Sequence, residues 1–154
     1  GVPANLVLIP VNFETDDLRE CLLSNGFDPE KPAFFSWPGV TYYLDLEAIR
    51  NTLRIIADLG APGSELVFDY ADDTAFDPAR ISDREKKLQS ITRQTGEPMK
   101  TGFVPADLEA ELCRFGFGTV ENLDPAGIEE RFFSNREDLY HAFDTAHFMH
   151  AVKL

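Results

Sequence analysis

The sequence predicts an α/β fold built on a largely parallel sheet. Short apolar runs alternate with longer segments of helical periodicity, and several of these runs are apolar on both faces. The 154 residues suit one domain, and 44% hydrophobic residues with thirteen Phe supply a core. Strands that alternate with helices in this way form a sheet that the helices cover.

An apolar run at residues 6–11, LVLIPV, predicts the first strand. Thr15 is a suitable N-cap for a helix expected over residues 16–24, whose first turn is acidic. Asn25 and Gly26 then end that helix, because both residue types tolerate the left-handed conformation found at helix C-termini.

The second strand is expected at residues 33–37, AFFSW, which two prolines delimit. The strongest helix signal covers residues 46–59, where apolar residues follow helical spacing between Asp45 as N-cap and Gly60 as the stop. Residues 65–70, ELVFDY, predict the third strand. Together these elements form a strand–helix–strand unit, the usual connection of a parallel sheet.

The polar stretch at residues 71–100 has a weak apolar stripe, so we interpret it as a connecting segment or lid with a helix around residues 83–95. Two strand signals near the C-terminus lie close together, which favours antiparallel pairing. The remaining expected elements are a helix over residues 105–115, a strand over 116–122, a short helix near 125–133, a helical segment over 138–145, and a last strand or helix end over 147–154.

The net charge of −13 argues against nucleic acid and anionic membranes as partners, because both require clustered Lys and Arg. No apolar run approaches the roughly 20 residues of a membrane span, and we see no signal peptide. The two cysteines, Cys21 and Cys113, form no CxxC motif or disulfide scaffold. We therefore expect a reduced, cytoplasmic protein.

The residues Asn12-Phe13-Glu14 follow the first expected strand, and ligands of open α/β sheets bind at the carboxyl ends of strands. The amide of Asn12 could hydrogen-bond the edge of a base while Phe13 packs on its flat face. The alternative is a turn that simply ends the strand, and without other support the sequence favours that alternative.

A second candidate is Ser36-Trp37-Pro38-Gly39, called the Trp37 turn below, which follows the second expected strand. Gly39 permits close backbone approach to a ligand, and Trp37 offers a stacking surface with one N–H donor. A buried Trp in a tight turn explains the same four residues equally well.

Metal binding and familiar catalytic motifs are not indicated. His147 and His150 would share a face on a helix but point to opposite faces on a strand, and no cysteine completes a metal set. The carboxylates of Asp69, Asp72 and Asp73 could bind Mg²⁺, but a solvated acidic loop is commoner. Without GxSxG, HExxH or P-loop motifs, no catalytic base is assigned and no metal is expected.

Several segments, taken in order, resemble one family, the S-adenosylmethionine-dependent methyltransferases related to leucine carboxyl methyltransferase. FFSWPGVTYYL and APGSELVFDY are specific to it, and the shorter segments add support. The matching segments are PVNFE at residues 10–14, GFDPEKP at 26–32, FFSWPGVTYYL at 34–44, APGSELVFDY at 61–70, GEPMKTGF at 96–103 and GFGTVENL at 116–123.

This resemblance implies the C-terminal part of a class I methyltransferase Rossmann-like sheet, mostly parallel with an antiparallel strand near the end. Residues 1–154 are then a partial domain without the N-terminal half that carries the glycine-rich cofactor loop. Residues 6–11 resemble the third strand of the family fold, and residues 71–100 its lid. Strands 6–11 and 33–37 would lack their family neighbours, so we expect them either to pair with each other or to form a homodimer through unpaired strand edges.

The resemblance also implies S-adenosylmethionine as cofactor, with Asn12 and Phe13 at its adenine and the Trp37 turn near its sulfonium. Family members usually carry Asp at the position of Asn12. Tyr42 and Tyr43 would flank the methyl acceptor. Leucine carboxyl methyltransferases have an acid at the position of Pro38, a departure that argues against a leucine carboxylate substrate.

The expected function is O-methylation of a small-molecule hydroxyl or carboxylate, in an enzyme of which this chain alone is inactive. One alternative is a non-catalytic half-domain that associates with itself or with a partner. Another is an α/β protein that binds an adenine-like ligand.

Overall fold

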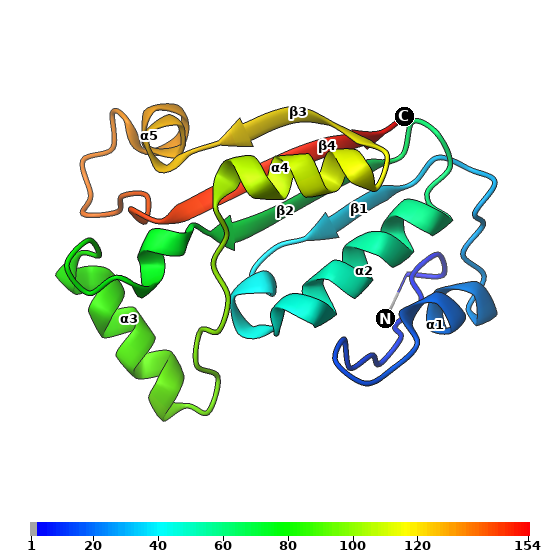
Figure 1. Cartoon of the computed structure of the whole chain (residues 1–154), viewed down its shortest axis with the longest axis horizontal. Helices are drawn as coiled ribbons and strands as arrows, with labels where there is room; N and C mark the ends of the chain where they lie inside the picture. The colour runs from blue at the N-terminus through cyan, green and yellow to red at the C-terminus, as the bar shows by residue number, and fades with distance from the viewer. Residues whose placement is uncertain (1–2) are drawn as a thin grey trace.

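The computed structural model describes residues 3–154 (Figure 1). Within that range no helix has both the length and the apolar character that crossing a bilayer requires. Its elements in chain order are α1 (Leu18–Ser24), β1 (Phe34–Trp37), α2 (Leu46–Leu59), β2 (Glu65–Ala71), α3 (Asp83–Gln94), α4 (Pro105–Arg114), β3 (Phe117–Leu123), α5 (Pro125–Ile128) and β4 (Ala146–Lys153), with 3₁₀ turns at Thr41–Tyr43 and Asp73–Phe76 and a π-helical turn at Glu129–Phe133.

The strands form one mixed sheet in the order β1-β2-β4-β3. β1 and β2 are parallel, whereas β4 runs antiparallel to both of its neighbours. The last strand of the chain is therefore inserted between two earlier ones. The predicted α/β fold and the antiparallel pairing of the two C-terminal strands are both confirmed.

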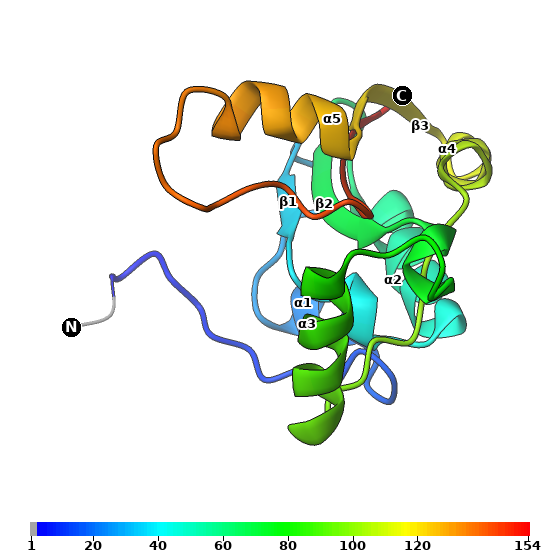
Figure 2. The same cartoon turned by 90° about the vertical axis from the view of Figure 1, so that its left-hand side faces the viewer.

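The core lies on the face of the sheet that α2 and α4 cover, and α5 lies on the opposite side (Figure 2). Strand alternation explains this division, because successive side chains point to opposite faces. Leu66, Phe68 and Tyr70 of β2 are fully buried on the α2 side, while Val67 and Asp69 between them are only partly covered.

Helix α2 has the predicted bounds and supplies one wall of the core through its apolar stripe. Ile49 and Leu53 are fully buried on that stripe. Gly60 ends the helix as expected, and its N–H donates to the Ile56 carbonyl at 2.8 Å. The predicted strands at residues 33–37 and 65–70 are also confirmed, each within one residue of its expected bounds.

The strand predicted at residues 6–11 is wrong. The segment is extended but has no strand partner in the described chain, and Leu8 is 74% exposed. An apolar run forms a strand only when a neighbour completes its hydrogen bonds. The edge of β1 does not supply that neighbour, because β1 pairs with β2 alone. Of the two expected alternatives, direct pairing of residues 6–11 with 33–37 is therefore not found, and pairing between chains stays a prediction.

Two local predictions also need correction. The N-cap of α1 is Asp17 and not Thr15, because the Asp17 carboxylate accepts from the Glu20 N–H at 3.1 Å. Residues 138–145 are not helical. Side chains outside this segment hydrogen-bond its backbone instead: the Glu129 carboxylate accepts from the Ala142 N–H at 2.8 Å.

The packing of α2 makes a first prediction. Replacing Leu53 by Ala should lower the free energy of unfolding by about 2–5 kcal/mol, because truncating this fully buried side chain leaves a cavity in the core. The matched control is Leu139→Ala, at a side chain that is 95% exposed, where a change within about 0.5 kcal/mol is expected. Urea unfolding followed by circular dichroism measures both, and equal losses would contradict the assignment of this core.

Candidate functional site

The carboxyl end of β1 carries an aromatic pair. Phe13 lies against Trp37 with ring centroids 5.5 Å apart, and Trp37 in turn lies 6.4 Å from Phe68. Trp37 is 7% exposed and belongs to the core, and neither it nor Phe13 lines the pocket described below. The buried Nε1 of Trp37 has no hydrogen-bond partner within residues 3–154. Both sequence-predicted aromatic residues therefore lie together.

Asn12 forms the turn that the sequence offered as the alternative to ligand binding. Its Oδ1 accepts from the Glu14 N–H at 2.9 Å, and its own N–H donates to Asp16 Oδ2 at 2.8 Å. The side chain remains exposed, and its NH₂ group has no partner among the described residues. The turn thus uses one lone pair of Oδ1 and leaves the amide donors free.

Gly39 turns the chain at the end of β1 with a φ of 74°. A side chain there would meet no atom within 4 Å, so the backbone conformation, and not the space, favours glycine. Its N–H donates to Asp69 Oδ1 at 2.6 Å. Ser36 and Pro38 of the same turn are exposed, and neither lines the pocket described next.

A pocket of about 380 Å³ opens at the carboxyl ends of β1 and β2. Gly39, Tyr42 and Tyr43 line its floor together with Asp69. The structure therefore brings the predicted acceptor residues and one end of the Trp37 turn onto a single cavity. Its roof comes from α3 and from the segment before β4, through residues that include Arg84, Leu88, Phe133, Tyr140, His141 and Phe143.

Tyr42 is held in its neutral form. Burial, followed by the negative charge of Asp69, raises the pKa of the Tyr42 hydroxyl well above its usual range. The ring meets Tyr43 edge-on, with centroids 6.2 Å apart. The Tyr42 carbonyl accepts from the Lys100 N–H at 2.7 Å. Tyr42 is thus a fixed, protonated hydroxyl on the pocket wall.

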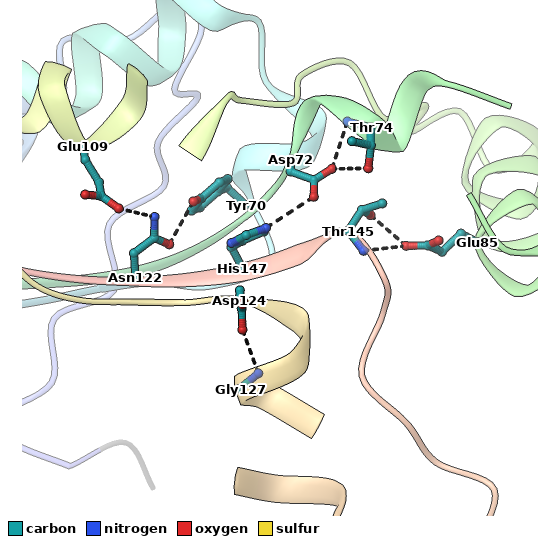
Figure 3. Close-up of polar contacts among 10 residues, drawn as sticks. All are labelled: Tyr70, Asp72, Thr74, Glu85, Glu109, Asn122, Asp124, Gly127, Thr145 and His147. Carbon is teal, nitrogen blue, oxygen red and sulfur yellow. Dashed lines mark hydrogen bonds and ion pairs between the residues drawn. The ribbon is translucent and has the colours of Figure 1, made fainter. Parts of the chain in front are cut away.

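A buried carboxylate fastens the two parts of the roof to each other (Figure 3). Glu85 is 4% exposed, and its Oε1 accepts from the Thr145 N–H at 3.1 Å and the Thr145 hydroxyl at 2.7 Å. Its Oε2 accepts from the Ser82 N–H at 3.2 Å, which completes a capping box at the start of α3. The S-x-x-E spacing of Ser82 and Glu85 signals such a box, and sequence reasoning missed it.

His147 belongs to a core network on the other face of β4 (Figure 3). Its ring stacks on Tyr70 with centroids 5.0 Å apart, and its Nε2 lies 3.3 Å from Asp72 Oδ2. The Tyr70 hydroxyl donates to Asn122 Oδ1 at 2.9 Å, and the Asn122 amide donates to Glu109 at 2.7 Å. The network therefore connects β2, β3, β4 and α4.

His150 points away from His147, as strand geometry requires, and its Nε2 lies 2.7 Å from Glu65 Oε2. Asp72 caps the following 3₁₀ turn by accepting from the Thr74 N–H at 2.9 Å. In the part of the chain that the structure describes, no group of three or more His, Cys, Asp or Glu side chains is placed to hold a metal ion.

This mixed sheet, with an antiparallel last strand inserted beside β2, is the fold of the class I methyltransferases. A candidate methyltransferase from Thermobifida fusca superposes with a TM-score of 0.59 at 23% identity, over 90% of this chain and 52% of that one. A DUF574 family protein from Streptomyces avermitilis gives 0.62 at 12% identity, over 88% and 52%. Likeness at such identities shows the fold alone.

Sequence comparisons then show which proteins the chain resembles. Residues 1–57 match the model of the leucine carboxyl methyltransferase family. The chain is 38% identical over 152 residues to YktD of Bacillus subtilis, described as a candidate S-adenosyl-L-methionine-dependent methyltransferase. The match covers 99% of this chain and 50% of YktD, so the chain spans about half the length of that relative. The chain thus resembles the leucine carboxyl methyltransferase family over its first 57 residues and this S-adenosyl-L-methionine-dependent methyltransferase relative over nearly its whole length, as its motifs predicted.

The core network makes a prediction about alkaline pH. Burial is the main cause that raises the pKa of Tyr70 to about 12 from an ordinary 10.0. Between these values the folded chain keeps a proton that the unfolded chain has lost, so stability falls as the pH rises from 10 towards 12. In Tyr70→Phe the free energy of unfolding should fall less over this pH range, by an amount on the order of 2 kcal/mol.

Urea unfolding at a series of alkaline pH values measures the effect. Tyr140→Phe is the matched control, because Tyr140 is 64% exposed and its substitution should leave the pH dependence unchanged. If the Tyr70→Phe profile runs parallel to that of the wild type, burial of the Tyr70 hydroxyl does not govern the alkaline limb.

Proposed function

We propose that the chain acts in S-adenosylmethionine-dependent methyl transfer to an oxygen of a small molecule, a hydroxyl or a carboxylate. One observation carries the proposal: Gly39, Tyr42 and Tyr43 line one pocket at the strand ends, in a chain whose relatives are described as methyltransferases. Ligands of open α/β sheets bind at this edge. Under this proposal the Asn12-Phe13 pair and the Trp37 turn hold the cofactor, and Tyr42 and Tyr43 contact the acceptor.

The residues present fit that cofactor. Phe13 offers a flat apolar face for adenine, and the exposed amide of Asn12 offers donors for the edge of the base. The unpartnered Nε1 of Trp37 is a buried donor beside them. Asp69 places a carboxylate beside Gly39, where a positively charged sulfonium would be stabilised.

When bound, the cofactor supplies a methyl group that is already a strong electrophile. The work left to this chain is to hold the acceptor oxygen in line and to exclude water. The protonated hydroxyl of Tyr42 can donate a hydrogen bond to the acceptor, and the surrounding aromatic walls limit water in the pocket. We also propose residues 71–100 as the lid, because α3 supplies one side of the roof.

Binding of S-adenosylhomocysteine tests the proposal directly. Trp37 is the only Trp, so its fluorescence reports on the site, and calorimetry gives the affinity. The wild-type chain should bind at micromolar concentration. Phe13→Ala should weaken binding about 5- to 150-fold, because stacking of a base on an aromatic ring is worth roughly 1–3 kcal/mol.

The control for this experiment is Phe132→Ala, at an exposed ring that does not line the pocket and whose loss should leave the affinity unchanged. Absence of wild-type binding at millimolar ligand would contradict a cofactor site formed by this chain.

A second candidate function, self-association, is favoured by the exposed sheet edge. β1 pairs on one side only, and Phe34 on it is 64% exposed. The segment at residues 6–11 exposes further apolar side chains, among them Val7 at 57% and Leu8 at 74%. Unpaired edges of this kind are templates for pairing with another chain, and we propose a homodimer through them.

Sedimentation velocity at micromolar to millimolar concentration measures this association. A wild-type dimer is expected, and Phe34→Lys should dissociate it, because a charged side chain on an edge strand opposes pairing. Leu139→Lys, at a side chain 95% exposed and far along the chain, should leave the dimer intact. A wild-type chain that stays monomeric at the highest concentration rules this mode of association out.

A further inference from the structure

Several aromatic side chains, Tyr42 among them, line the pocket. Tyr43, Phe133, Tyr140, Phe143 and Phe148 all line it, and they come from the 3₁₀ turn after β1, the π-helical turn, the loop before β4 and β4 itself. Rings of this number around one cavity of about 380 Å³ suit a flat apolar ligand with few polar groups.

The charged side chains on these walls are almost all engaged. Glu85 accepts hydrogen bonds from Thr145 and Ser82. Asp69 accepts from the Gly39 N–H. The guanidinium of Arg84 donates to the His141 carbonyl at 2.8 Å and lies 4.1 Å from the ring centroid of Phe143. Arg84 is the one Lys or Arg among the residues that line the pocket, and beside the carboxylates of Asp69 and Glu85 it leaves these walls net negative, which disfavours a carboxylate ligand.

His141 differs from the other polar residues of the pocket. Its Nδ1 lies 2.9 Å from Glu129 Oε1, and the other oxygen of that carboxylate accepts from the Ala142 N–H at 2.8 Å. Two contacts thus fix the Glu129 carboxylate, and the carboxylate in turn orients the imidazole. A carboxylate at Nδ1 favours the tautomer with the proton on that nitrogen, which leaves the lone pair on Nε2.

The Nε2 of His141 has no hydrogen-bond partner among residues 3–154. The side chain is 61% exposed and lines the main pocket, so a ligand can reach it. An imidazole backed by a carboxylate, with its other nitrogen unpaired and the residue on the lining of a pocket, is the arrangement of a general base.

Resting on the proposed function, we propose that the acceptor is a flat aromatic molecule with a hydroxyl group, and that His141 accepts the proton of that hydroxyl. The acceptor oxygen forms a bond to the methyl carbon as the bond from carbon to sulfur breaks. The sulfonium becomes a neutral thioether, and the hydroxyl proton moves to Nε2 of His141. Glu129 is a positioning residue that holds the imidazole and stabilises its positive charge.

4-Nitrophenol tests the proposal with the full chain and without cofactor, because its absorption spectrum changes when it loses its proton. The wild-type chain should bind it, and the bound dye should ionise at a lower pH than the free dye. His141→Phe should keep binding but lose this shift, since the ring remains and the base does not. Glu129→Gln should give a smaller shift than the wild type.

Substitution of an aromatic residue on the pocket wall tests binding itself. Phe148→Ala, at a pocket residue 37% exposed, should weaken 4-nitrophenol binding at least about tenfold, the loss expected from removing an aromatic contact worth roughly 1.5 kcal/mol. Phe132→Ala, outside the pocket, should not. 4-Nitrobenzoate is the matched carboxylate and should bind more weakly than 4-nitrophenol.

The outcomes separate this inference from the proposed function. Binding of S-adenosylhomocysteine without binding of 4-nitrophenol overturns the inference and leaves the cofactor site standing. Preference for 4-nitrobenzoate, or an equal shift in the wild type and His141→Phe, also overturns it. A His141-dependent shift in a chain that does not bind S-adenosylhomocysteine supports the hydroxyl site and contradicts the methyl-transfer function.

Discussion

The pairing of β4 with both β2 and β3 is the interaction on which the rest of the structure depends. β4 is the last strand, yet it lies inside the sheet and hydrogen-bonds on both sides. Its start, at Ala146, brings the preceding loop to the carboxyl ends of β1 and β2. Its end is fastened by Lys153, whose N–H donates to the Ser64 carbonyl at 2.7 Å. Without this insertion neither the core face nor the pocket roof would form.

Polar side chains hold helix α3 and the pocket roof in place, where little apolar surface is buried. Helix α3 exposes Ile91 at 48%, and its buried contact is the carboxylate of Glu85 and not an apolar stripe. The roof is therefore held by a few hydrogen bonds, and moving it would expose little apolar surface. Segments of this kind open at low free-energy cost, which is the property that the proposed lid requires.

The two ends of the candidate site also differ in what holds them: one is packed into the core and the other is held by polar contacts on a loop. The Phe13 and Trp37 rings are packed into the core, so the proposed cofactor end is rigid. The His141 end lies on a loop that is positioned by Glu129 and Arg84. The net charge of the whole chain, −13, favours solubility over contact with polyanions.

The sequence by itself determined the elements whose signals are local. Helical spacing and Gly60 defined α2, apolar letters between turn residues defined β1 and β2, and the Trp37 turn was correctly placed at a strand end. Tyr42 and Tyr43 line the pocket, and their contact with a methyl acceptor, which the family motif implies, stays a prediction.

Tertiary structure decided whatever depends on a distant partner. Residues 6–11 have the apolar pattern of a strand, but a strand needs a neighbouring strand to complete its hydrogen bonds. The sequence pattern does not show whether such a neighbour is present. The place of β4 in the sheet, the loop at residues 138–145 and the contact of His141 with Glu129 all join residues that are not adjacent in the chain. The sequence therefore determined local conformation, and only the packed chain decided which side chains meet in the pocket.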